Sequence, residues 1–325
     1  MRYKEIDIIK GLCMLLVFFQ HSILYYPVNY IQVYPICKLI SESIGSFFMP
    51  CFFVVSGFLF FSSTKGCKVH FHNKIYRLLV PYISVCLLQF CIKLMLPSLA
   101  FGKFGSIKEY VYYYLFQGGD RWFLYVLFLV FVLMIPLKRY LNTSSKICFA
   151  LIVLYAVSLS GILPYIYPLS KTQHFSIYFL WGYLLRIYYG DVKQHVINYW
   201  WLYTFLFVII NIAFLPYLQF MIKGIFAPLT GTVFLFAATN KLLDSNVYLV
   251  EKWHKMVSYV GKYSLQFYVM TGFVLAIARY IVVNKFDQES PWVVIPFVFF
   301  LQILFATVGV KLCERMRVTR FMFGY

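Results

Sequence analysis

Residues 6–26 read IDIIKGLCMLLVFFQHSILYY, an apolar run long enough to cross a lipid bilayer once as a helix. Nine further apolar runs follow, over 44–62, 75–97, 122–141, 147–167, 174–189, 197–217, 224–240, 259–283 and 291–312. Each run is a continuous apolar block and not the alternating pattern of a barrel strand, so we expect helices. The sequence therefore predicts an all-α membrane protein with about ten transmembrane helices. The sixth and eighth runs are short, and either could be tilted or partly re-entrant.

The composition agrees with this architecture. Of the 325 residues, 62% are apolar and only 12% are charged, whereas soluble domains carry about 25% charged residues. The mean hydropathy of +0.77 leaves too little polar surface to coat a globule in water. A soluble enzyme, a disordered chain and a secreted disulfide scaffold are therefore excluded. The eight cysteines lie mostly inside apolar runs and form no Cys-x-x-Cys pair, so we expect free thiols and no metal site.

The excess of positive charge predicts the orientation of the chain. There are 29 Lys and Arg residues against 11 Asp and Glu residues, which gives a net charge of +18. A basic chain can bind nucleic acid, but these basic residues cluster in short loops between apolar runs. If the N-terminus is inside, most of them fall in inside loops, as the positive-inside rule requires. We therefore expect one multi-pass membrane domain over residues 1–325, both termini in the cytoplasm, and no nucleic-acid partner.

Three ionisable residues interrupt the first span: Asp7, Lys10 and His21. Such groups are costly at membrane depth, at about 2.5–3.5 kcal/mol for Arg, Lys or Asp, so they indicate function. At about 100° and 1.5 Å per residue, Lys10 and His21 share one helix face and lie about 16 Å apart. Asp7 lies three residues before Lys10, where the two can form an ion pair. A neutral imidazole at depth can act as a general base, although His21 could equally bond a neighbouring helix backbone.

Other candidate positions lie further along the chain. Lys74 and Arg77 are three residues apart at a helix start, and a basic pair of this kind suits phosphate binding. The alternative explanation of these two charges is the positive-inside rule or contact with anionic lipid. Ser56 belongs to a Ser-Gly pair that permits close helix approach. Trp122 is typical of an interfacial anchor, and Ser264 of a polar contact between helices.

Three charged residues lie at the ends of predicted spans. Asp120 and Arg121 open the fourth span on the outer side, where they could hydrogen-bond a sugar hydroxyl. Arg279 lies near the outer end of the ninth span, and we expect its guanidinium to snorkel to the interface.

Five short motifs occur in order over nearly the whole chain. They are Asp7-Ile-Ile-Lys10-Gly11 with His21, Phe52-Phe-Val-Val-Ser56-Gly57-Phe58, Lys74-Ile-Tyr-Arg77 followed by Pro81, Trp122-Phe123-Leu124, and Gly261-Lys-Tyr-Ser264-Leu. Together they resemble the acyltransferase-3 family of integral membrane acyltransferases, and within it the fucose 4-O-acetylase-like branch. The basic pair departs from the family pattern, because it is Lys-x-x-Arg and not Arg-x-x-Arg. The His that often follows the late Ser is missing, since residues 268–271 read YVMT, and so is a Glu that some members carry after the Trp.

The resemblance implies transfer of an acyl group, usually acetyl from acetyl-CoA, to a sugar hydroxyl. It implies that Lys10, Lys74 and Arg77 bind coenzyme A phosphates, and that His21 deprotonates the hydroxyl or carries the acetyl group covalently. Substrate contact or structural support would come from Asp7, Ser56, Trp122 and Ser264. The implied partners are acetyl-CoA as co-substrate, a surface glycan or lipid-linked sugar as acceptor, and membrane lipid, with no permanently bound cofactor. The implied location is a plasma (inner) membrane, in a bacterium.

Two other functions remain open at this point. A transporter or flippase for a lipid-linked sugar would show repeat symmetry and a charged site at the membrane midplane, and we find neither. A polysaccharide polymerase would favour a large outer loop, and the outer segment at 98–121 is of modest length.

Overall fold

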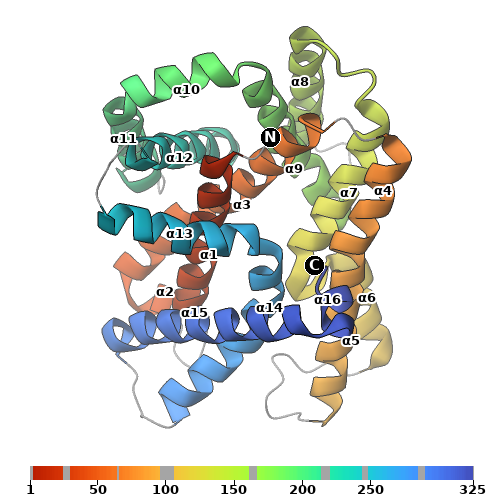
Figure 1. Cartoon of the computed structure of the whole chain (residues 1–325), viewed down its shortest axis with the longest axis vertical. Coiled ribbons are helices and arrows are strands. Elements are labelled where there is room, and N and C mark those ends of the chain that lie inside the picture. The colour runs from red at the N-terminus through yellow and green to blue at the C-terminus, as the bar shows by residue number, and fades with distance from the viewer. Residues whose placement is uncertain are drawn as a thin grey trace. The chain divides into compact units, whose positions relative to one another are not determined.

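The computed structural model describes residues 3–24, 30–63, 66–95, 106–160, 167–213, 220–243, 248–284 and 290–324 (Figure 1). Of these described residues 93% are helical, and none of them lies in a strand. The predicted all-α class is therefore confirmed. The chain divides into two compact units, each of which is described by itself. This division does not test the single domain expected over residues 1–325, which stays a prediction.

The first unit comprises Met1–Val55 and Tyr188–Gly309. Its elements are α1 (Lys4–Leu24), α2 (Tyr30–Val33), most of α3 (Pro35–Phe61), α10 (Tyr189–Asn198), α11 (Trp200–Val208), the π-helix η4 (Ile209–Ala213), α12 (Phe220–Leu243), α13 (Tyr248–Lys262), α14 (Ser264–Arg279), the π-helix η5 (Tyr280–Asn284) and most of α15 (Pro291–Arg315). Prolines inside α3, α12 and α15 do not end these helices, as is common in membrane spans.

The second unit comprises Ser56–Ile187 and Val310–Tyr325. Its elements are the end of α3, α4 (Cys67–Lys74), the π-helix η1 (Ile75–Leu79), α5 (Val80–Met95), α6 (Ile107–Gln117), the 3-10 turn η3 (Gly119–Arg121), α7 (Trp122–Leu137), α8 (Ser144–Ser160), α9 (Tyr167–Ile187), the end of α15, and α16 (Arg317–Met322). Helix α6 falls within the segment at 98–121 that the sequence suggested as an outer loop, of which 98–105 lies outside the described residues.

Among the described residues, seven helical stretches are long and apolar enough to cross a membrane. They are Lys4–Ile23, Pro35–Phe61, Cys67–Ile92, Ile107–Leu137, Ile225–Leu243, Ser264–Val282 and Pro291–Arg315. These match the first four and the last three of the ten predicted spans. The fifth to seventh predicted spans also fall on helices, but those helices are shorter or more polar, so these spans and the orientation of the termini stay predictions. The eighth predicted span, 224–240, is shorter than the helix that contains it, because α12 has 24 residues. Lys223 and Lys241 bound the apolar run, but the helix continues through both lysines.

Helices α1 and α13 cross at a contact between two glycines. Figure 1 shows α13 lying across α1. A Cβ atom on Gly11 of α1 would overlap the carbonyl oxygen of Val257, and a Cβ on Gly261 of α13 would overlap that of Asp7. A side chain at either glycine would push the two backbones apart. The contact therefore fixes the N-terminal helix against a helix that comes much later in the chain.

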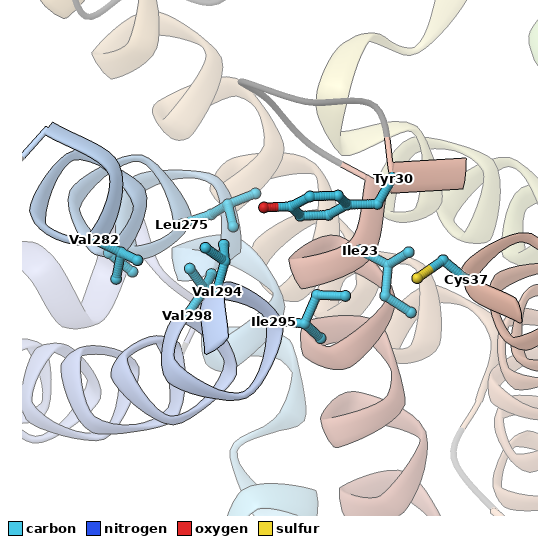
Figure 2. Close-up of a cluster of buried hydrophobic side chains, with 9 residues drawn as sticks. Ile23, Tyr30, Cys37, Leu275, Val282, Val294, Ile295 and Val298 are labelled. Atoms are coloured by element: carbon cyan, nitrogen blue, oxygen red, sulfur yellow. The ribbon is translucent and has the colours of Figure 1, made fainter. Parts of the chain in front are cut away.

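A buried apolar cluster holds the end of α1 that carries His21. It brings Ile23 of α1, Tyr30 of α2 and Cys37 of α3 together with side chains of α14, η5 and α15 (Figure 2). The members from these later elements are Leu275, Ala278, Val282, Val294, Ile295 and Val298. Because Ile23 lies two residues after His21, packing of this cluster restrains the turn that carries the imidazole.

In the second unit, the end of α3 packs closely on α9. A Cβ atom on Gly57 would overlap the carbonyl oxygen of Phe179, so the two backbones are in contact. The ring of Phe60 lies near those of Phe131 and Phe179, with centroids 5.6 and 5.7 Å away. The close helix approach predicted from the Ser-Gly pair is confirmed at Gly57.

Candidate active site

Asp7 and Lys10 form the ion pair that their spacing predicts. Lys10 Nζ lies 2.8 Å from Asp7 Oδ1, and the two side chains are only 20% and 11% exposed. A lysine ammonium has three donor hydrogens, so this pair does not exhaust its capacity to bind an anion. Gly261 packs on the carbonyl oxygen of the same Asp7, which places the ion pair at the crossing of α1 and α13.

A second acidic residue, Glu5, anchors the start of α1. Glu5 is buried, accepts a hydrogen bond from the Tyr189 hydroxyl, and lies 3.3 Å from Lys193 Nζ. Glu5 and Lys193 are 188 residues apart in the sequence. Both partners lie on α10, far along the chain, so no local spacing could have identified this cluster.

His21 is half-buried on α1, and a buried arginine contacts its backbone. Arg279, the last residue of α14, donates from Nη2 to the main-chain oxygen of His21 at 3.4 Å. Because Arg279 is only 6% exposed, its predicted snorkelling to the interface is wrong. The guanidinium donates to an acceptor on α1, and the position of Arg279 in the sequence does not reveal that contact.

Glutamine side chains hold the turns on either side of this histidine. Gln302 of α15 donates to the main-chain oxygen of Phe18 at 3.2 Å and to Ser22 Oγ at 2.8 Å. Gln20 donates to the main-chain oxygen of Ser41 on α3 at 3.0 Å. Polar side chains therefore tie this part of α1 to three other helices, α3, α14 and α15. Such contacts restrain the backbone that carries His21.

The motif Gly261-Lys-Tyr-Ser264-Leu contacts the motif that contains Asp7, although the two lie far apart in the sequence. Ser264 is half-buried and begins α14, three residues after Gly261, the glycine in contact with Asp7. Lys10 and His21 lie on one uninterrupted helix, as predicted, because α1 spans Lys4–Leu24. A role for the Ser264 hydroxyl stays a prediction.

Lys74 and Arg77 belong to the second unit and have different surroundings. Lys74 is half-buried, with Nζ 3.7 Å from the ring centroid of Phe131, whereas Arg77 is exposed. Helix α4 ends at Lys74, and Ile75–Leu79 form the π-helix η1. A shared face no longer follows from the three-residue spacing, because a π-helix has more residues per turn. Phosphate binding by this pair stays a prediction.

Trp122 and Ser56 also lie in the second unit. The ring of Trp122, at the start of α7, lies 5.4 Å from that of Phe175, and Lys171 Nζ lies 4.0 Å from its centroid. Both partners are on α9, so the indole contributes to the packing of α7 on α9. Ser56 is half-buried beside the glycine that contacts α9. Contact of either residue with an acceptor stays a prediction.

Asp120 already has protein partners. Its carboxylate accepts from the hydroxyls of Tyr113 and Tyr114, at 3.0 and 3.3 Å. Arg121 is buried beside it in the chain. The two residues proposed for a sugar hydroxyl therefore lie within a structured junction between α6 and α7.

Comparison with known proteins identifies the family. The acyltransferase-3 family, described as an acyltransferase domain, matches residues 3–311, nearly the whole chain. No curated protein and no solved structure matches the chain. The matched range contains all five motifs, from Asp7 to Ser264. The chain therefore belongs to the acyltransferase-3 family and is a membrane acyltransferase.

Proposed function

We propose that this protein transfers an acetyl group from cytoplasmic acetyl-CoA to a hydroxyl of a surface or lipid-linked glycan, as a fucose 4-O-acetylase-like member of its family. The observation that carries the proposal is α1, a restrained helix with an ion-paired ammonium near one end and an imidazole near the other. These groups lie about 16 Å apart along the helix. Coenzyme A has a matching layout, with phosphates at one end and the thioester at the end of a long arm.

His21 is the general base in this proposal. Its neutral imidazole takes the proton of the acceptor hydroxyl while the hydroxyl oxygen attacks the thioester carbonyl carbon. The tetrahedral intermediate then collapses, the C–S bond breaks, and the leaving thiolate takes up the proton. In the alternative relay, an imidazole nitrogen attacks the thioester carbonyl carbon first, and the C–S bond breaks to release the thiolate of coenzyme A. The sugar hydroxyl oxygen then attacks the acetyl carbon, the C–N bond to the imidazole breaks, and the thiolate takes up the hydroxyl proton.

The other residues bind or support in this proposal. Lys10 contacts coenzyme A phosphate with the donors that Asp7 leaves available, and Lys74 and Arg77 bind phosphate as well. Residues that contact the acceptor or support the site are Asp7, Ser56, Trp122 and Ser264. The protein lies in a bacterial plasma (inner) membrane with both termini inside, so that the Lys10 end of α1 meets the cytoplasmic donor.

Mass spectrometry of surface glycans tests the proposal. Cells that lack the protein are complemented with wild type, His21→Ala, or His195→Ala, a control at an exposed histidine on α10. At equal membrane abundance, we expect wild type and the control to restore acetyl mass and His21→Ala to fail. Full restoration by His21→Ala would remove the role of His21. Loss of whole repeat units, with unchanged acetylation of what remains, would favour a transporter or polymerase.

A further inference from the structure

The last helix of the second unit, α16, is fixed at both of its ends. It is separated from α15 by Met316, whose backbone is extended. The Thr319 hydroxyl donates to the main-chain oxygens of Cys313 and Met316, at 2.8 and 3.0 Å, and so closes the turn between the two helices. Phe323, directly after α16, is only 5% exposed. The helix therefore has a defined orientation on the unit that carries it.

The outer surface of α16 combines charged and apolar side chains. Arg317 and Arg320 are exposed and lie three positions apart, on one face of the helix. Val318 and Phe321 are 68% and 56% exposed. Exposed apolar side chains on a fixed helix cost free energy in water, and they mark surfaces that contact another molecule or a membrane. We call the surface formed by these four residues the α16 patch.

Exposed rings from an earlier part of the chain adjoin this patch. The ring of Tyr76, on η1, lies 6.0 Å from that of Phe321. The imidazole of His72, on α4, lies 4.6 Å from the ring of Tyr76, and both side chains are exposed. Helix α16 also packs on α5, which follows η1 (Figure 1). The patch is therefore part of a tertiary surface and not the loose end of a chain.

The α16 patch lies at the end of a membrane-spanning stretch. Helix α15 is long and apolar enough to cross a membrane, and it ends at Arg315, two residues before α16 begins. Its exposed side chains Leu304, Val308 and Leu312 recur every four residues, as expected of a stripe that faces lipid. The patch follows directly after this stripe. It therefore lies at the boundary between hydrocarbon and water, where phospholipid headgroups are found.

The charge of this part of the chain is strongly positive. Residues 310–325 contain one acidic residue and four basic residues, all four of them exposed: Lys311, Arg315, Arg317 and Arg320. Each Lys or Arg near an anionic membrane surface strengthens binding by about fivefold. A water-soluble anion such as coenzyme A would meet the arginines but leave Val318 and Phe321 in water. An anionic phospholipid offers a charged headgroup for the first and acyl chains for the second.

We propose that the α16 patch binds anionic phospholipid, with the headgroup phosphate at its two arginines and its two apolar side chains among the acyl chains. A guanidinium can donate two parallel hydrogen bonds to one phosphate, so arginine suits this contact. The inference goes beyond the acetyl transfer proposed above and does not depend on it. Because Phe321 lies beside Tyr76, lipid bound to the patch also holds α16 against η1.

Hydrogen exchange of the full-length protein, read by mass spectrometry over residues 317–322, tests the inference. The protein in dodecyl maltoside is titrated with dioctanoyl phosphatidylglycerol, dioctanoyl phosphatidylcholine or coenzyme A. We expect only phosphatidylglycerol to slow the exchange of α16, because a ligand of the folded helix opposes its local opening. Equal protection by phosphatidylcholine overturns the inference, because the headgroup charge is then not recognised. Protection by coenzyme A overturns it in favour of a soluble anion, and no protection at all overturns it in favour of a protein partner.

Charge substitutions with a matched control sharpen this test. We expect Arg317→Gln/Arg320→Gln to need about 25-fold more phosphatidylglycerol for the same protection, at about fivefold for each arginine removed. Lys252→Gln/Lys255→Gln, exposed on α13, removes the same charge and leaves the response of α16 unchanged.

A second variant keeps both arginines. If exchange without lipid shows that the charge variant has lost the helix, Val318→Ser replaces it, with an expected weakening of about threefold from the lost apolar contact. A wild-type response from the folded variants overturns the inference. An equal loss of response in the α13 control also overturns it, because net charge and not the α16 patch then attracts the lipid.

Discussion

Two sides of α1 are built in opposite ways. Toward α13, Gly11 and Gly261 bring the backbones into direct contact and leave no space for a side chain. Toward α3, α11 and α12, Leu12 and Leu16 line an open cavity of about 360 Å³. The close contact fixes the helix that carries the candidate site residues, and on the open side α1 presents leucine side chains.

Gly261→Ala is expected to have the largest effect on the close contact. Its Cβ would overlap the carbonyl oxygen of Asp7, so α13 must move away from α1. We expect a loss of about 3 kcal/mol in the free energy of unfolding, together with loss of acyl transfer, measured by thermal unfolding and acetyl-CoA turnover. Gly190→Ala on α10 is the control, because nothing lies within 4 Å of its Cβ. If both variants unfold like wild type, the backbone contact is refuted.

Substitutions at two neighbouring positions of α1 compare its packed and its open surroundings directly. Met14 is fully buried, whereas Leu15 lines the cavity. We expect Met14→Ala to lower the free energy of unfolding by about 2 kcal/mol, and Leu15→Ala by clearly less because it has fewer packing partners to lose. Chemical denaturation of the purified variants in the same detergent measures the difference. Equal losses would mean that the cavity closes in solution.

Lys10→Gln tests whether the residue beside the close contact binds the donor. Removal of one charge-assisted hydrogen bond to phosphate is expected to weaken acetyl-CoA binding by about tenfold. The measurement is the concentration of acetyl-CoA needed to raise the melting temperature, since a ligand that binds only the native state stabilises it. Lys255→Gln, an exposed lysine on α13, serves as the control. A wild-type response from Lys10→Gln would leave Lys10 only as the partner of Asp7.

Gln302→Leu is expected to have the smallest effect on stability. It removes the hydrogen bonds to Phe18 and Ser22, and such contacts between membrane helices are worth about 0.6 kcal/mol on average. Because these bonds restrain the turn that carries His21, we expect a lower kcat with little change in melting temperature. Gln194→Leu, exposed on α10, controls for loss of an amide elsewhere. A fall in melting temperature with unchanged kcat would make Gln302 a purely structural residue.

Features set by neighbours in the chain could be predicted from the sequence. The apolar runs located helices because a backbone in hydrocarbon must satisfy its own hydrogen bonds within one segment. The Asp7–Lys10 ion pair could be predicted from the three-residue spacing. The close helix contact at Gly57 could be predicted because glycine has no side chain to hold a neighbouring helix away. For Lys74 and Arg77 the three-residue spacing does not by itself predict a shared face, because local winding into the π-helix η1 changes the angle per residue.

By itself the sequence determined the all-α class, seven of the ten predicted spans, the acyltransferase-3 motifs and the place of Lys10 and His21 on one helix. Only the tertiary structure decided which helices meet. It placed Gly261 on Asp7, buried Arg279 against the backbone of His21, and left a hydrocarbon-lined cavity beside Leu12 and Leu16. The physical reason is that hydropathy and helical spacing act along a single segment. Contacts between helices depend instead on side-chain shape at positions far apart in the chain, and in lipid hydropathy no longer distinguishes one apolar neighbour from another.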